Sequence, residues 1–249
     1  MFGFDDWLAA LGAGHPLLLA SVVAVLLGLR HATDPDHLSA VTTLVAGDPS
    51  AGVRSAVRMG LAWGAGHATT LFGFGLPIVL FSGSLPRWAQ QAAEAAVGAL
   101  IVVLAVRLLV RWRAGAYHLH HHRHQRAAHS HLHGHAPGPL HGHHHPQLAR
   151  SPLAAYGIGL VHGMGGSAGV GVLLLASIAD TALAVTALAL FALFTALSMA
   201  ACSGGFGAAL STAAARRSFS RLAPALGLGG IAFGGWYFAA AFSLVGYPF

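Results

Sequence analysis

Six apolar stretches, each long enough to cross a lipid bilayer, constrain the fold of this 249-residue chain more than any other feature. A transmembrane helix needs about 20 apolar residues. Only 8% of the residues are charged, whereas about a quarter are charged in a typical soluble domain. The sequence therefore predicts an all-α polytopic membrane protein with six transmembrane helices. The predicted spans are 16–47, 57–83, 90–112, 153–178, 181–203 and 222–247.

The basic residues predict how these spans are oriented. All thirteen basic residues are arginines, and ten of them follow the first, third or fifth span. Arg87 alone lies on the opposite side. Basic loops stay in the cytoplasm, so we expect both termini outside and residues 114–150 inside, in a plasma (bacterial inner) membrane. Orientation explains the net charge of +6 better than a nucleic-acid partner does.

The first apolar stretch carries a metal-ligand motif where polar groups are most expensive. Residues 31–37 read HATDPDH, near the middle of the stretch. An ionisable residue inside a span is a functional-site hypothesis by default. Imidazole and carboxylate together suit nickel, cobalt, zinc and related ions. The motif predicts a mid-membrane metal site with His31, Asp36 and His37 among its ligands.

Proline in this motif predicts a broken span. On a regular helix the side chains of His31 and Asp36 point in different directions. Pro35 lacks an N–H and clashes with the carbonyl four residues earlier, so a break here would let the ligands converge. Asp34 has three open interpretations: a ligand, a group that orients the following histidine, or an ion-pair partner of Arg30.

A further histidine, His67, lies mid-way along the second stretch, beside glycines that permit close helix approach. We favour it as a fourth metal ligand over a simple hydrogen bond between helices. Four other polar residues could hydrogen-bond the ligands, line the ion pathway, or only join helices. These are Thr33, Thr69, Thr70 and Ser167.

A faint internal repeat relates the two halves of the chain. A shift of 131 residues lays 28–31 over 159–162, so His162 becomes the counterpart of the first motif histidine. Glycines interrupt the fourth stretch just after this point, at Gly163, Gly165 and Gly166. Paired interrupted helices indicate the substrate site of a transporter. The sequence thus predicts inverted three-helix repeats over 1–113 and 151–249, and leaves His162 open as ligand or pathway residue.

Between the repeats, residues 114–150 are rich in histidine and poor in apolar residues. Such a segment has too little apolar surface to bury and is predicted to be disordered. It is either a solvated linker or an expression tag, or, as we favour, an auxiliary metal-binding segment. Its histidines are His118, His120, His121, His122, His124, His129, His131, His133, His135, His141, His143, His144 and His145.

The segment from Arg30 to Leu38, with its His-x4-Asp-His spacing, resembles the signature helix of the nickel/cobalt transporter (NiCoT) family. Residues 66–69 are similar to the Gly-His-Ser/Thr element of that family's next helix. The resemblance implies Ni²⁺ or Co²⁺ as substrate. The histidine-rich segment and the glycine-rich fourth span look more like the branch of efflux proteins and urease-associated permeases. The residues implied in metal handling are His31, Asp36, His37 and His67.

These features together predict a secondary transporter that works by alternating access. No Walker motif is present, and we expect neither an enzyme nor an organic cofactor. The expected partners are a divalent metal ion and the lipid bilayer, with a metallochaperone or a second copy of the chain as further candidates. Metal efflux instead of uptake, and a membrane-embedded metalloenzyme with histidine boxes, remain alternatives.

Overall fold

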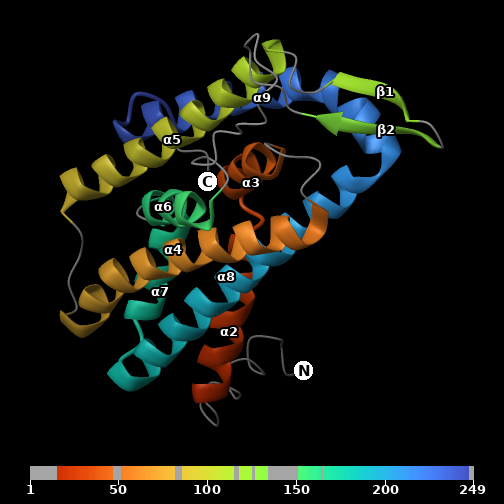
Figure 1. Ribbon diagram of the computed structural model, residues 1–249. Helices are drawn as coiled ribbons and strands as arrows, with labels where there is room; N and C mark the ends of the chain where they lie inside the picture. The colour runs from red at the N-terminus through yellow and green to blue at the C-terminus, as the bar shows by residue number, and fades with distance from the viewer. Residues whose placement is uncertain are drawn as a thin grey trace, which may run out of the picture.

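In a computed structural model, the chain is a bundle of helices with one β-hairpin among its described residues (Figure 1). The structure describes residues 16–46, 52–81, 86–114, 118–124, 127–133, 151–163, 165 and 167–246. The helices are α2 (Pro16–His31), α3 (Pro35–Ala46), α4 (Gly52–Phe81), α5 (Arg87–Arg113), α6 (Pro152–His162), α7 (Ser167–Ala176), α8 (Thr181–Ser211) and α9 (Ala213–Ala241). The strands are β1 (His118–His124) and β2 (Ala127–His133).

Four of these helices are long and apolar enough to cross a membrane: α4, α5, α8 and the 221–241 part of α9. α2 and the first part of α3 pass the same test together, meet at a bend of 47°, and count as a fifth span if the bent pair crosses as one. The chain is therefore a multi-pass membrane protein. The fourth apolar stretch is divided between α6 and α7, two helices of 11 and 10 residues. Six complete spans thus remain a prediction.

The long helices pack in pairs. In Figure 1, α4 and α8 cross in the middle of the bundle and α5 lies along α9, while α6 packs on α4 and α2 packs on α8. Small residues allow the central pair to approach closely. A Cβ added at Gly64 of α4 would lie 2.7 Å from the Cα of Ala196 on α8. The central helices therefore form a tightly packed support for the broken ones.

The predicted break in the first span occupies three residues, 32–34. The amide of Thr33 donates to the carbonyl of Arg30 at 2.9 Å, so α2 closes with a tight turn. Pro35 then occupies the first position of α3, where its missing N–H is not needed and its fixed φ favours helix. Pro35 therefore begins the second half of the span, whereas the motif predicts it inside the break.

The β-hairpin lies in the histidine-rich segment, where the sequence predicts disorder. Its strands pair antiparallel from His118 opposite His133 to His124 opposite Ala127. The two strands differ from the predicted all-α class at this point, while the disorder predicted for 114–150 stays a prediction. A lone two-stranded hairpin is only marginally stable in water. Residues 134–150, with the five remaining histidines of the segment, lie outside the described residues.

Candidate metal centre

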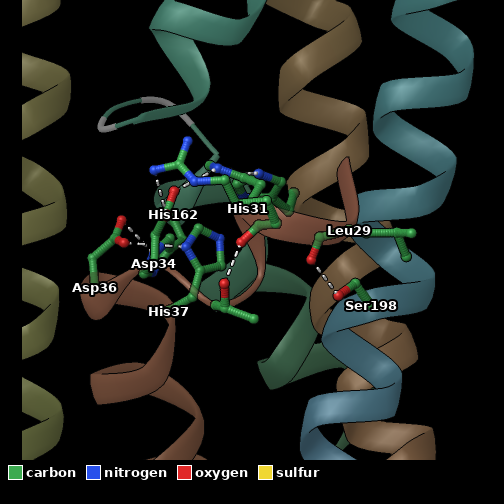
Figure 2. A network of polar contacts seen from close by, with 10 residues as sticks. Leu29, His31, Asp34, Asp36, His37, His162 and Ser198 are labelled. Carbon is green, nitrogen blue, oxygen red and sulfur yellow. Dashed lines mark hydrogen bonds and ion pairs between the residues drawn. The ribbon is translucent and has the colours of Figure 1, made fainter. Parts of the chain in front are cut away.

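The break between α2 and α3 brings the two histidines of the motif together. His31 is the last residue of α2, and His37 lies in the first turn of α3. Their ring centroids are 4.4 Å apart, and each residue is at most 4% exposed. On a continuous helix these side chains would point about 120° apart. Figure 2 shows that the two rings instead converge where the ribbon is interrupted.

Each of these histidines has a carboxylate at its Nδ1 atom. Asp34 Oδ2 lies 3.2 Å from Nδ1 of His31, and Asp36 Oδ1 lies 3.2 Å from Nδ1 of His37. An Nδ1–H that donates to a carboxylate leaves Nε2 with its lone pair for a metal. Asp34 also lies 3.5 Å from the Arg30 guanidinium. The ion pair with Arg30, one of the three interpretations of Asp34, is therefore present in the structure. The Asp34 carboxylate lies beside Nδ1 of His31, whereas another interpretation placed it beside His37.

The next histidine comes from α4. His67 is fully buried, and its Nε2 lies 3.1 Å from Nε2 of His31. Its ring centroid is 5.1 Å from those of His31 and His37. The neighbouring glycine, Gly66, has no room for a side chain, because a Cβ there would overlap the carbonyl oxygen of Tyr156 on α6. The glycine therefore lets α6 approach α4 beside His67.

A fourth histidine comes from α6. His162 is fully buried; its Nε2 lies 3.3 Å from Oδ2 of Asp36, and its ring centroid is 4.4 Å from that of His37. It reaches this position because Gly159, one turn earlier, lies directly on α4. A Cβ at Gly159 would overlap the carbonyl oxygen of Trp63. The structure therefore brings His162 together with the four predicted ligands: Figure 2 shows it beside His31, Asp36 and His37, and its ring centroid lies 6.2 Å from that of His67.

Within the described part of the chain, these five side chains form two groups that could hold a metal ion. One is His31, His37 and His67; the other is Asp36, His37 and His162. In each group the donor atoms lie within 4.8 Å of one another. Nε2 of His37 and Nδ1 of His67 and His162 are buried without a hydrogen-bond partner among the described residues. Buried polar atoms without partners destabilise a protein, so this cluster is suited to bind a cation.

The chain is similar to a urease accessory protein, UreH, from Bacillus sp. (strain TB-90). The two are 26% identical over 162 residues, which are 65% of this chain and 64% of that protein. The chain therefore spans less than two thirds of the length of this relative. No protein-family model and no solved structure matches the chain. The similarity supports the predicted likeness to the nickel/cobalt transporter superfamily in broad terms.

Two predicted polar residues join helices instead of entering the cluster. The hydroxyl of Thr70 donates to the carbonyl of Leu160 on α6 at 2.8 Å. The hydroxyl of Thr69 lies 3.0 Å from that of Tyr156, also on α6. Neither threonine contacts a ligand group through these bonds. Both hold α6 against α4, and so act on the position of His162.

Polar groups also stabilise the end of α2. Thr33 is exposed, and its hydroxyl donates to the carbonyl of Arg30 at 2.6 Å. The break frees the carbonyl of Leu29, and Ser198 of α8 donates its hydroxyl to it at 2.9 Å (Figure 2). A freed carbonyl inside a membrane needs such a partner. Ser198 is not predictable from the motif, because nothing in the local sequence relates it to α2.

The second break is built from glycine. Gly163 ends α6, and its amide donates to the carbonyl four residues earlier at 2.9 Å. A Cβ at Gly165 would lie 3.0 Å from the backbone nitrogen of Glu94 on α5. Gly166 and the side chain of Ser167 lie outside the described part of the chain. At this break the backbone therefore packs closely on α5. The candidate ligand His162 lies just before it.

Two aromatic residues that the sequence analysis did not assign line the cluster. The Trp63 ring centroid lies 5.6 Å from that of His37 and 5.5 Å from that of His162. Phe191 of α8 lies 5.7 Å from the ring of His31. Both aromatics are 1% exposed, so they shield the imidazoles from lipid and water. Trp63 lies one helical turn before the predicted histidine of α4, a spacing that could have identified it.

Proposed function

We propose that the chain is a secondary transporter of a divalent transition-metal ion, Ni²⁺ or Co²⁺, across the plasma membrane. The observation that carries the proposal is the convergence of five buried metal-binding side chains at the break in the first span. They come from α2, α3, α4 and α6, so no single helix holds the ion. Burial of such groups in a multi-pass membrane protein is expensive unless it serves a function.

The spacing of the donor atoms supports a first-row divalent ion. With metal–nitrogen bonds near 2.1 Å, neighbouring donors on one ion lie roughly 2.9–3.4 Å apart. The two Nε2 atoms of His31 and His67 are 3.1 Å apart, and Nε2 of His162 is 3.3 Å from Oδ2 of Asp36. One pair in each group is therefore already at the spacing that a bound ion requires, and the remaining donors lie within 4.8 Å. Imidazole and carboxylate without a thiolate disfavour a soft ion such as Cu⁺.

The choice of nickel or cobalt has two supports. The motif and its spacing resemble the signature of nickel/cobalt transporters, and a urease accessory protein is a relative of the chain. Urease-associated permeases belong to the branch that the sequence resembles. Uptake and efflux are both compatible with this assignment, and the flux measurement below distinguishes them.

Alternating access by two inverted halves, 1–113 and 151–249, is the proposed mechanism. It is supported by the two interrupted helices, α2/α3 and α6/α7, and by their packing on the opposite halves, α2 on α8 and α6 on α4. Rocking of such halves would expose a midplane site to each side in turn. We further propose that both termini face outward and that 114–150 is a cytoplasmic auxiliary metal-binding segment.

The test is metal flux in proteoliposomes, with Ni²⁺, Co²⁺ and Zn²⁺ supplied on either side. We expect Ni²⁺ or Co²⁺ flux that is lost in His37→Ala and Asp36→Ala. Thr33→Ala is the matched control, because this residue lies in the same break but is exposed and bonds a backbone carbonyl. Deletion of 118–145 should leave flux measurable. Wild-type flux no greater than that of protein-free liposomes would refute the proposal.

A further inference from the structure

The two groups of candidate ligands share one residue, His37. We propose that they are two successive binding positions for the transported ion, and that His37 stays bound while its partners exchange. This inference rests on the proposed function and adds the path that the ion takes inside the buried site. We name the two groups the imidazole set (His31, His37 and His67) and the carboxylate set (Asp36, His37 and His162).

The imidazole set lies entirely within the first half of the chain. Its members come from α2, α3 and α4. Nε2 of His31 and Nε2 of His67 are 3.1 Å apart. The set contains no charged ligand when its histidines are neutral, so an ion bound there keeps its full double charge.

The carboxylate set joins the two halves of the chain. Asp36 and His37 come from α3, and His162 comes from α6. The Asp36 carboxylate offsets part of the charge of the ion. Oδ2 of Asp36 and Nε2 of His162 already lie 3.3 Å apart. An ion that moves to this set therefore exchanges two imidazoles of the first half for one carboxylate and an imidazole of the second.

Geometry indicates that the two sets are used in turn. The ring of His37 lies 4.4 Å from that of His31 and 4.4 Å from that of His162. It is thus equally close to one histidine of each set, whereas the rings of His67 and His162 are 6.2 Å apart. One imidazole nitrogen binds one ion at a time, and two divalent cations this close together would repel strongly. The step is a ligand exchange, with water filling the open coordination positions.

Variants that remove one set at a time test this inference. The probe is Co²⁺, whose visible absorption reports on its ligands and geometry, added to the purified full-length protein in detergent. The number of Co²⁺ ions in the buried site is the number bound by wild type minus the number bound by His37→Ala. Both proteins contain the histidine-rich segment, so Co²⁺ bound there cancels in this difference. We expect this difference to be one Co²⁺ per chain. His67→Ala should keep that ion on the carboxylate set, and His162→Ala should keep it on the imidazole set, with two distinct spectra.

A second variant of each set guards against misfolding. His31→Ala should reproduce the spectrum of His67→Ala, and Asp36→Asn should reproduce that of His162→Ala. In proteoliposomes all four variants should lose flux by more than about tenfold while each still binds Co²⁺, because the ion is held at one position and has no second one. Binding without transport in both pairs is the signature of two successive positions.

The outcomes separate this inference from the proposed function. If wild type binds and transports the ion, but one variant of either set abolishes binding in a folded protein, the five side chains form a single site and the inference is wrong. A difference of two Co²⁺ per chain, or wild-type flux in His162→Ala, would overturn it as well. If wild type moves no metal at all, the proposed function fails instead, whatever the spectra show.

Discussion

Two helix crossings in this molecule have nearly the same geometry but different chemistry. In one, α6 lies on α4 at Gly159, where a Cβ would overlap the carbonyl oxygen of Trp63. In the other, α2 lies on α8 at Gly28, where a Cβ would come within 2.7 Å of the carbonyl oxygen of Phe191. Each crossing thus depends on a glycine that meets the backbone of the opposite helix beside a buried aromatic residue.

The likeness extends one turn further along each crossing helix. His162 follows its glycine by three residues and lies 5.5 Å from the ring of Trp63. His31 follows its glycine by three residues and lies 5.7 Å from the ring of Phe191. The backbone contact and the aromatic wall therefore place a histidine in the same way at both crossings. This agreement is the strongest structural support for the proposed repeat.

The crossings differ in the residue that lies one turn beyond the aromatic on the opposite helix. On α4 this residue is His67, a member of the imidazole set. On α8 it is Thr195, which is fully buried and whose hydroxyl has no hydrogen-bond partner among the described residues. The breaks differ as well, since the first contains or adjoins Asp34 and Asp36 and the second is glycine. Equivalent packing thus positions His31 and His162. Four of the five candidate metal ligands, however, belong to the first half of the chain.

The largest effect is expected where the α6–α4 crossing is broken. Gly159→Ala places a methyl group against the Trp63 carbonyl, and neither backbone can move without disturbing its helix. We expect a loss of about 3 kcal/mol or more in the free energy of unfolding, at the upper end for overpacking, and loss of metal flux. Thermal unfolding in detergent measures the first and proteoliposome flux the second.

Gly157→Ala is the matched control for this substitution. This glycine lies two residues earlier on the same helix, and a Cβ there would meet nothing within 4 Å. Its unfolding midpoint should stay close to that of wild type. If the two alanine variants unfold at the same temperature, α6 does not rest on α4 at the glycine.

Much of this arrangement follows from local sequence. The apolar stretches locate α4, α5, α8 and most of α9, and the HATDPDH motif locates the first break. His31, Asp36, His37 and His67 were selected because an imidazole or carboxylate deep in a span is costly. The structure places these four residues in one cluster, and their role as metal ligands stays a prediction. Depth in the membrane and helix interruption are both visible without knowledge of the tertiary contacts.

The rest depends on contacts between distant segments. His162 joins the cluster only because Gly159 permits backbone contact with Trp63, a residue 96 positions earlier in the chain. The spacing of residues along α6 does not encode that contact. The repeat gave the one available signal, since it aligned His162 with His31. For Asp34 the sequence could not choose between neighbouring histidines, because the choice depends on the path of three residues at the break.

The α2–α8 crossing should tolerate substitution slightly better than its counterpart. A Cβ at Gly28 would lie 2.7 Å from Phe191 O and 3.0 Å from Thr195 N, so contact is close but the overlap is smaller. We expect Gly28→Ala to destabilise the protein by about 1–3 kcal/mol. The unfolding midpoint should fall between those of Gly159→Ala and wild type. A midpoint below that of Gly159→Ala would show that the second crossing is the tighter one.

A smaller effect is expected from the hydrogen bond across the α6–α4 crossing, the counterpart of the bond from Ser198 to the Leu29 carbonyl at the α2–α8 crossing. The buried hydroxyl of Thr70 donates to the carbonyl of Leu160 at 2.8 Å. Thr70→Val keeps the shape of the side chain and removes the donor. We expect a loss of about 1 kcal/mol, typical of hydrogen bonds between membrane helices. Thermal unfolding checks this value, and an unchanged midpoint would mean that this hydrogen bond does not help to hold α6 in place.

The smallest effect is expected at Thr195, which occupies the place of His67 at the other crossing. Its hydroxyl is fully buried and unpartnered among the described residues, and Val has nearly the same shape. Thr195→Val should therefore leave the free energy of unfolding within about 0.5 kcal/mol of wild type or raise it slightly, because an unsatisfied buried hydroxyl is removed. Co²⁺ affinity should not change. A weaker affinity in Thr195→Val would instead make this hydroxyl an oxygen ligand, and the two crossings would then share the metal chemistry that we assign to the first half alone.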